Sequence, residues 1–110
     1  MKTTTKKRLE RAGWKVGTVS DFLGLSKEDE AFVELKVALA KALRRRREER
    51  GLTQVELARL VGSSQPRVAH MEASEASVSL DLLVRTLLAL GSSLSDVARV
   101  VRTAGRVPAA

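Results

Sequence analysis

The stretch that decides the fold spans residues 51–72 and reads GLTQVELARLVGSSQPRVAHME. Thr53 followed three residues later by Glu56 is a capping box, which predicts a short helix that stops at Gly62. Ser64 is the next capping residue and predicts a second short helix. Two capped helices joined by a turn that contains a glycine meet the requirements of a helix-turn-helix.

Apolar side chains in this stretch are spaced so that the two helices pack against each other. The residues expected at this contact are Leu57, Ala58, Val61, Val68 and Met71. The other side of the second helix carries residues that are short or form hydrogen bonds, namely Gln65, Arg67, Ala69 and His70. This side is therefore expected to be exposed.

The segments around this stretch are also helical in pattern. A long helix is expected over about residues 27–50, with acidic residues first and arginines last, as the helix dipole favours. Its apolar stripe is expected to comprise Phe32, Leu35, Leu39, Ala42 and Leu43. Ser79 and Ser93 begin two further helices. The sequence thus predicts an all-α domain of five helices, without a strand between residues 27 and 102.

The helical pattern also suggests how the chain is divided. We expect a short N-terminal extension over residues 1–26, a helix-turn-helix domain over residues 27–104 and a flexible tail over residues 105–110. Gly105 and Pro108 mark the start of this tail.

Composition narrows the function classes. The 110 residues carry a net charge of +7, which favours polyanionic partners such as nucleic acid. There is no cysteine and only one histidine, so neither a cysteine-based zinc site nor thiol catalysis is expected. We expect no enzyme activity, no catalytic residues, no cofactor, no metal and no membrane partner, and a cytoplasmic location.

The sequence resembles the XRE family of Cro/C1-type repressors over about residues 39–101. The residues that carry the resemblance are the run Arg47-Glu48-Glu49-Arg50-Gly51-Leu52-Thr53-Gln54, then Leu57-Ala58, Gly62, Ser64-Gln65, Glu72, Leu82-Leu83 and Ala89-Leu90-Gly91. The resemblance implies a lambda-repressor-like five-helix domain that binds double-stranded DNA.

The resemblance also implies roles for single residues. The recognition helix begins at Ser64, and Gln65 at its tip is expected to contact a base edge, adenine in particular. Gln54 is expected to bind a phosphate, Arg67 a phosphate or a guanine, and His70 a base or a phosphate.

Arg47 and Glu72 match the buried ion pair of the family, which ties the long helix to the recognition helix. The sequence departs from the family pattern at two positions. Ser63 stands where an apolar residue is usual, so the turn is expected to pack more loosely. Ser74 stands where a glycine usually follows the recognition helix.

The implied function is a transcriptional repressor that regulates its own operon as a homodimer. The expected dimer contact is the apolar face of the last helix, formed by Leu94, Val97, Val100 and Val101. Residues 13–26 are in addition similar to HigA-type antitoxins. The alternative is therefore a type II antitoxin that binds and neutralises a ribonuclease toxin.

Overall fold

The structure is a computed structural model that describes residues 26–105. Internal contacts divide the chain into two units, Met1–Val33 and Glu34–Ala110. In the first unit the described residues form the beginning of helix α3 (Lys27–Glu49). Ser26 caps this helix, because its Oγ accepts a hydrogen bond of 3.0 Å from the backbone N–H of Asp29. The expected extension before Ser26 and the tail after residue 105 lie outside the described residues.

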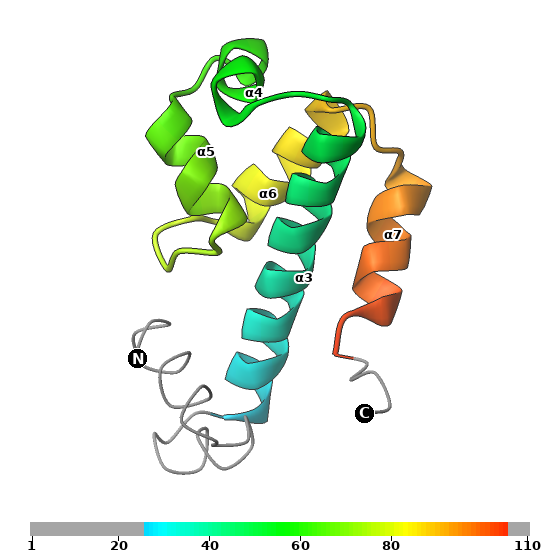
Figure 1. The fold of residues 1–110 in the computed structure, drawn as a ribbon. Coiled ribbons are helices and arrows are strands. Elements are labelled where there is room, and N and C mark those ends of the chain that lie inside the picture. The colour runs from blue at the N-terminus through cyan, green and yellow to red at the C-terminus, as the bar shows by residue number, and fades with distance from the viewer. Residues whose placement is uncertain (1–25, 106–110) are drawn as a thin grey trace. The chain divides into compact units, whose positions relative to one another are not determined.

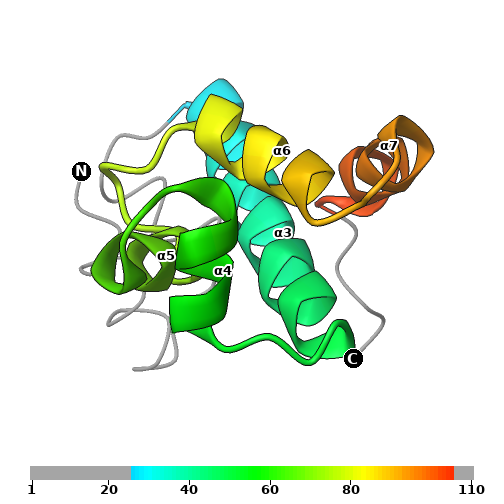
Figure 2. The same cartoon turned by 90° about the horizontal axis from the view of Figure 1, so that it is seen from above.

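Five helices and no strand are present in residues 26–105, which confirms the predicted all-α fold. The four helices after α3 are α4 (Gln54–Val61), α5 (Gln65–Glu72), α6 (Leu80–Ala89) and α7 (Leu94–Thr103). Figures 1 and 2 show α4 and α5 together on one side of α6, with α7 on the opposite side. The two helices of the predicted helix-turn-helix are therefore neighbours in space.

One hydrophobic core joins α3 to the three helices that follow it. Its buried members are Leu39, Ala40, Leu43, Leu57, Ala58, Val68, Met71, Val78, Leu83, Leu87 and Leu90. Among the residues expected between α4 and α5, only Val61 is half-buried, and it packs against this core. The expected apolar stripe of α3 is correct for Leu39 and Leu43, whereas Phe32 is 46% exposed.

Helix α7 begins at a capping box in which Ser93 and Asp96 exchange hydrogen bonds. None of its residues is fully buried. Val97 and Val100 are partly buried against the core of their own chain. Leu94 is 75% exposed and Val101 is 49% exposed. The predicted apolar face is therefore divided between the core and the surface.

Two arginines, one in the last turn of α3 and one directly after it, tie this end of the helix to the end of α6. Arg46 Nε and Arg50 Nη1 both donate hydrogen bonds of 3.2 Å to the carbonyl oxygen of Leu90. Leu90 is the C-cap of α6, and carbonyls at a helix end have no partner within the helix. The arginines satisfy this carbonyl and fix the point at which the chain leaves α6.

Candidate nucleic-acid interface

Local hydrogen bonds define where α4 begins and ends. Thr53 Oγ1 accepts from the backbone N–H of Glu56 at 3.1 Å, and Glu56 Oε1 accepts from the backbone N–H of Thr53 at 2.9 Å. The latter bond is the main cause that lowers the pKa of Glu56, since it favours the carboxylate form. At the other end Gly62 adopts a left-handed φ of +67°, and Ser63 N–H donates to Ala58 O at 2.8 Å. The tight turn of the motif is thus formed by backbone bonds.

Helix α5 begins directly after this turn. Ser64 Oγ accepts a hydrogen bond of 3.3 Å from the backbone N–H of Arg67. Pro66 is compatible with the first turn, because backbone N–H groups there have no partner within the helix. Val68 and Met71 are fully buried and determine which side of the helix faces the core.

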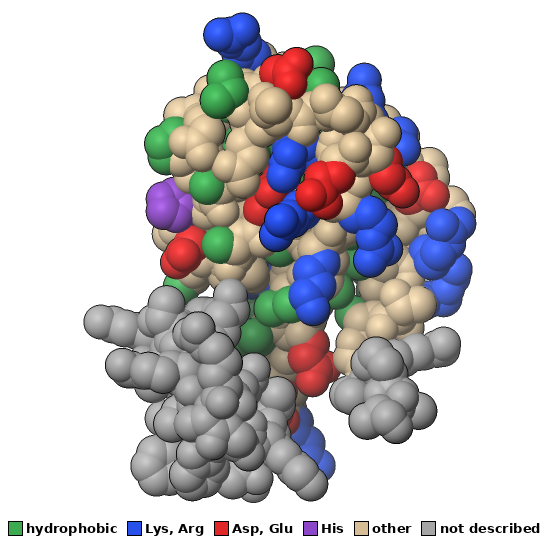
Figure 3. All heavy atoms as spheres, in the orientation of Figure 1, with side chains coloured by type: hydrophobic (Ala, Val, Ile, Leu, Met, Phe, Trp, Pro, Cys, Tyr) green, Lys and Arg blue, Asp and Glu red, His purple; other side chains and the backbone are tan. Residues whose placement is uncertain are grey.

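The opposite side of α5 faces away from the core. Gln65, Pro66 and His70 are exposed there, and Ala69 is half-buried. In Figure 3 the histidine side chain lies at the edge of the molecule over α5, with hydrophobic side chains beside it. The exposed side of α5 therefore combines polar and apolar groups.

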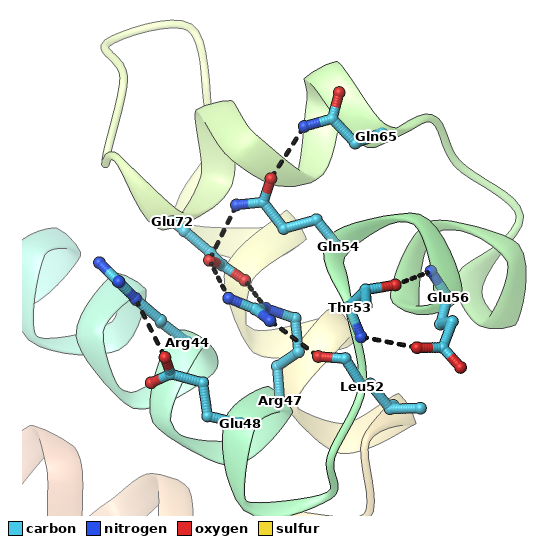
Figure 4. A network of polar contacts seen from close by, with 9 residues as sticks. All are labelled: Arg44, Arg47, Glu48, Leu52, Thr53, Gln54, Glu56, Gln65 and Glu72. Carbon is cyan, nitrogen blue, oxygen red and sulfur yellow. Dashed lines mark hydrogen bonds and ion pairs between the residues drawn. The ribbon is translucent and has the colours of Figure 1, made fainter.

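A chain of side-chain hydrogen bonds links three helices behind this surface (Figure 4). Arg47 on α3 donates to Glu72 at the end of α5, with Nε to Oε2 at 2.6 Å and Nη2 to Oε1 at 3.0 Å. Gln54 Nε2 at the start of α4 donates to the same Glu72 Oε1 at 3.1 Å. Gln65 Nε2 at the start of α5 then donates to Gln54 Oε1 at 2.8 Å. We call the chain Glu72–Gln54–Gln65 the amide relay.

The carboxylate of Glu72 determines the direction of the amide relay. An ionised carboxylate only accepts hydrogen bonds, so Gln54 must present its amide nitrogen to it. The amide oxygen of Gln54 then faces Gln65 and accepts from its nitrogen. Gln65 is left with its own Oε1 acceptor and its second N–H donor. The relay therefore gives an exposed side chain one donor and one acceptor in a fixed arrangement.

The ion pair behind the relay is shielded from water. The side chain of Arg47 is 12% exposed and that of Glu72 is 5% exposed. Arg47 Nη1 also donates to the carbonyl oxygen of Leu52 at 2.7 Å, which holds the loop before α4. The hydrogen bonds to Glu72 are the main cause that raises the pKa of Arg47, so its guanidinium stays charged.

Arg67 lies at the other flank of α5, beside a groove of about 620 Å³. Ser64 and Arg67 line this groove on one side, and Arg85 and Thr86 of α6 line it on the other. Arg85 pairs with Asp81 at 3.1 Å, and both of these side chains are more than 70% exposed. This flank of α5 therefore carries two exposed guanidinium groups.

Comparison with known proteins assigns the family. Residues 43–97 match the family described as Helix-turn-helix, and this match covers half of the chain. A Haemophilus influenzae protein named as an uncharacterized HTH-type transcriptional regulator is 37% identical over 70 residues, which are 64% of this chain and 71% of that protein. No solved structure gives a significant match. The chain belongs to the XRE-type helix-turn-helix family.

The first departure from the pattern of XRE-type proteins lies in the turn. Ser63 stands at the position where an apolar residue is usual, and its Oγ is buried without a hydrogen-bond partner. A buried hydroxyl without a partner lowers stability. Ser63 also lines the groove beside Arg67.

The second departure follows the recognition helix. The backbone N–H of Ser74 donates to Met71 O at 3.1 Å, and that of Glu75 donates to His70 O at 3.1 Å. These two bonds form a Schellman motif, which places Ser74 in the left-handed region with a φ of +54°. Ser74 is the only non-glycine residue with a positive φ in the described part of the chain.

Sequence reasoning assigned the site residues separately and missed the contacts between them. It did not predict that Gln54 contacts Gln65, or that Gln54 shares an oxygen of Glu72 with Arg47. Ser64 has the capping position expected for it. The motif places Gln54 and Gln65 at two helix starts, and only the crossing of α4 and α5 brings these starts together.

Residues 26–105 contain neither a cluster of metal ligands nor a membrane-spanning helix. Within this range no three histidine or acidic side chains gather in an arrangement that could hold a metal ion. In the same range no helix combines the length and the apolar character needed to cross a membrane.

Proposed function

We propose that this XRE-type protein is a transcription regulator that binds specific double-stranded DNA, with α5 in the major groove. The observation that carries the proposal is the amide relay, because it holds Gln65 at the exposed start of α5 with a defined donor and acceptor. The net charge of +7 supports a polyanionic partner. The name of the Haemophilus influenzae relative supports a regulatory role. We assign DNA binding to residues 27–104.

Adenine is the base that suits Gln65. The major-groove edge of adenine offers the acceptor N7 and the donor N6–H₂. The free N–H of Gln65 would donate to N7, and its Oε1 would accept from N6. Because Glu72 and Gln54 fix the direction of the relay, the amide is ordered before DNA binds, which lowers the entropic cost of the contact.

The neighbouring polar groups are suited to the DNA backbone. Gln54 lies at the start of α4 and keeps one N–H for a phosphate, next to the backbone N–H groups of the first turn. Arg67 lies at the flank of α5, beside Arg85, which favours a phosphate over a guanine. Ser64 lies at the helix tip close to the DNA, and His70 lies one turn after Pro66, within reach of a base or a phosphate.

We further propose that the protein acts in the cytoplasm as a homodimeric repressor of its own operon. One recognition helix contacts few base pairs, and two copies would read half-sites about 34 Å apart. The exposed Leu94 and Val101 on α7 provide an apolar surface for the second copy. The antitoxin alternative rests on residues 13–26, of which only Ser26 belongs to the described range. We therefore place the regulator first.

Selection from a random duplex library tests the proposal. The full chain is incubated with duplexes that carry a random 24-base-pair region, and bound molecules are sequenced after several rounds. We expect an enriched motif that contains adenine, and loss of this enrichment for Gln65→Ala. Recovery of no motif, with equal binding to all duplexes, would contradict sequence-specific regulation.

A further inference from the structure

The outward side of α5 contains an apolar surface between the exposed side chains of Gln65 and His70. With 100° per residue, Ala69 follows Gln65 by about one turn, and His70 follows Pro66 by about one turn. Pro66 is exposed and Ala69 is half-buried, while the buried Val68 lies on the opposite side. The surface made by Pro66 and Ala69 therefore lies next to the amide held by the relay.

This surface cannot take part in hydrogen bonding with bases. Pro66 and Ala69 have no polar side-chain atoms, so either one placed against a base donor or acceptor would remove that group from water without replacing its hydrogen bond. The C5-methyl group of a pyrimidine is the apolar feature that the major groove presents. In ordinary DNA this methyl group belongs to thymine.

The relay indicates where such a methyl group would lie. If Gln65 contacts adenine, the partner strand carries thymine in the same base pair, and its methyl group lies in the same groove. Pro66 and Ala69 also have no rotamer freedom to lose on binding, so an apolar contact would carry almost no entropic cost.

We propose that Pro66 and Ala69 read the C5-methyl group of thymine at or beside the base pair contacted by Gln65. This inference rests on the proposed function and adds a determinant of specificity to it. The same chemistry occurs in 5-methylcytosine, but the amide contact with adenine favours thymine.

Replacement of thymine by uracil tests the contact without changing the protein. The duplex selected in the experiment above is prepared with each thymine replaced singly by uracil, which deletes the methyl group and keeps the base pair. We expect about fourfold weaker binding at one or two positions, the effect of one buried methyl group. Uracil in the flanking DNA serves as the control and should have no effect.

Variants of the protein connect the effect to these residues. In Pro66→Ser and Ala69→Ser the difference between thymine and uracil should disappear at the sensitive positions, whereas Ala31→Ser at the exposed start of α3 should retain it. A further duplex pair with cytosine or 5-methylcytosine at the sensitive position separates the two sources. If 5-methylcytosine binds more tightly than cytosine but more weakly than thymine at this position, the result supports thymine. If the 5-methylcytosine duplex binds more tightly than the thymine duplex, the result contradicts thymine.

Two results would overturn the inference while leaving the proposed function intact. One is a selected duplex in which no thymine is sensitive to uracil. The other is a sensitivity that persists unchanged in both serine variants. Failure to select any duplex would instead overturn the proposed function and the thymine contact together.

Discussion

Arg47 and Glu72 are 25 residues apart in the sequence, yet their largely buried side chains form two hydrogen bonds of 2.6 and 3.0 Å. Replacement of Arg47 alone would leave the carboxylate of Glu72 buried without its counter-charge. A fully buried pair would lose about 3–5 kcal/mol in this way. Because Arg47 keeps some exposure, we expect Arg47→Met to lower the free energy of unfolding by an amount at or below that range, measured by urea denaturation.

A matched control for this variant lies one turn earlier in α3. Arg44 pairs with Glu48 at 3.6 Å, but these side chains are 64% and 56% exposed. Arg44→Met should therefore cost less than about 1 kcal/mol. The double variant Arg47→Met/Glu72→Leu should lose less than the sum of its single variants. Equal stability of Arg47→Met and Arg44→Met would show that the buried pair has no structural role.

The amide relay predicts that replacement of Gln54 and replacement of Gln65 weaken DNA binding in different ways. Gln65→Ala should weaken binding to the selected duplex by about 1–3 kcal/mol and change binding to a scrambled duplex little, because it removes the proposed base contact. Gln54→Ala should weaken binding to both duplexes, because it removes the proposed phosphate donor. It should affect the selected duplex more, because Gln65 also loses its support.

Fluorescence anisotropy titrations with both duplexes measure these losses. Circular dichroism of each variant serves as the folding control. Equal losses on the two duplexes for Gln65→Ala would mean that the recognition helix is assigned to the wrong segment.

Arg67 at the flank of α5 should act through a phosphate. For double-stranded DNA each phosphate contact contributes about 0.9 to the slope of log K against log salt concentration. We expect Arg67→Ala to reduce this slope by about that amount on both duplexes. Lys27→Ala, at the start of α3, should leave the slope unchanged. A loss confined to the selected duplex, with the slope retained, would instead indicate a guanine contact.

Replacement of Ser74 by glycine is expected to raise the stability of the fold. Its φ of +54° lies in the region where a Cβ atom is unfavourable, and glycine has no Cβ. Ser74→Gly should therefore raise the free energy of unfolding by about 1 kcal/mol. Gly62→Ala should lower it by a similar amount. A Cβ at Gly62 would have no atom within 4 Å, so the effect there would come from the backbone alone.

Urea denaturation measures both substitutions under the same conditions. Gly62→Ala is the matched opposite of Ser74→Gly, since both positions follow a helix end in the left-handed conformation. A loss of stability in Ser74→Gly would indicate that the serine hydroxyl contributes more than the backbone strain costs.

We expect two copies of the protein to contact each other through the exposed apolar residues of α7. Leu94→Asp combined with Val101→Asp should shift the protein from dimer to monomer in light scattering at micromolar concentration, because charges would then be buried between two copies. Leu60→Asp is the matched control, since Leu60 is also an exposed apolar residue, at 54% exposure, but lies on α4. A wild-type protein that is monomeric in solution and on DNA would contradict the dimer.

The parts of the fold that the sequence predicts are those determined by local interactions. Thr53, Ser64 and Ser93 each cap a helix through a hydrogen bond to a backbone N–H three residues later. Such signals span one turn and can be identified without knowledge of the tertiary structure. They account for the accuracy of the helix starts.

Contacts that depend on how two helices cross could not be predicted from the sequence. Gln54 and Gln65 are 11 residues apart and meet only because α4 and α5 pack at a particular angle. Apolar periodicity placed Val97 and Val101 on one face, but it does not tell which residue packs against the protein's own core. The assignment of these residues to a DNA-binding site therefore stays a prediction from the sequence, and the structure adds how their side chains are connected.

Three arginines at the end of α3 have a consequence for operator geometry. Arg47 holds the recognition helix through Glu72, while Arg46 and Arg50 hold the carbonyl of Leu90, just before the chain turns into α7. In a dimer joined through α7, the distance between the two copies of α5 therefore depends on the contacts at the C-terminal end of α3. A substitution there would change the tolerated number of base pairs between half-sites and leave the preferred bases within each half-site the same.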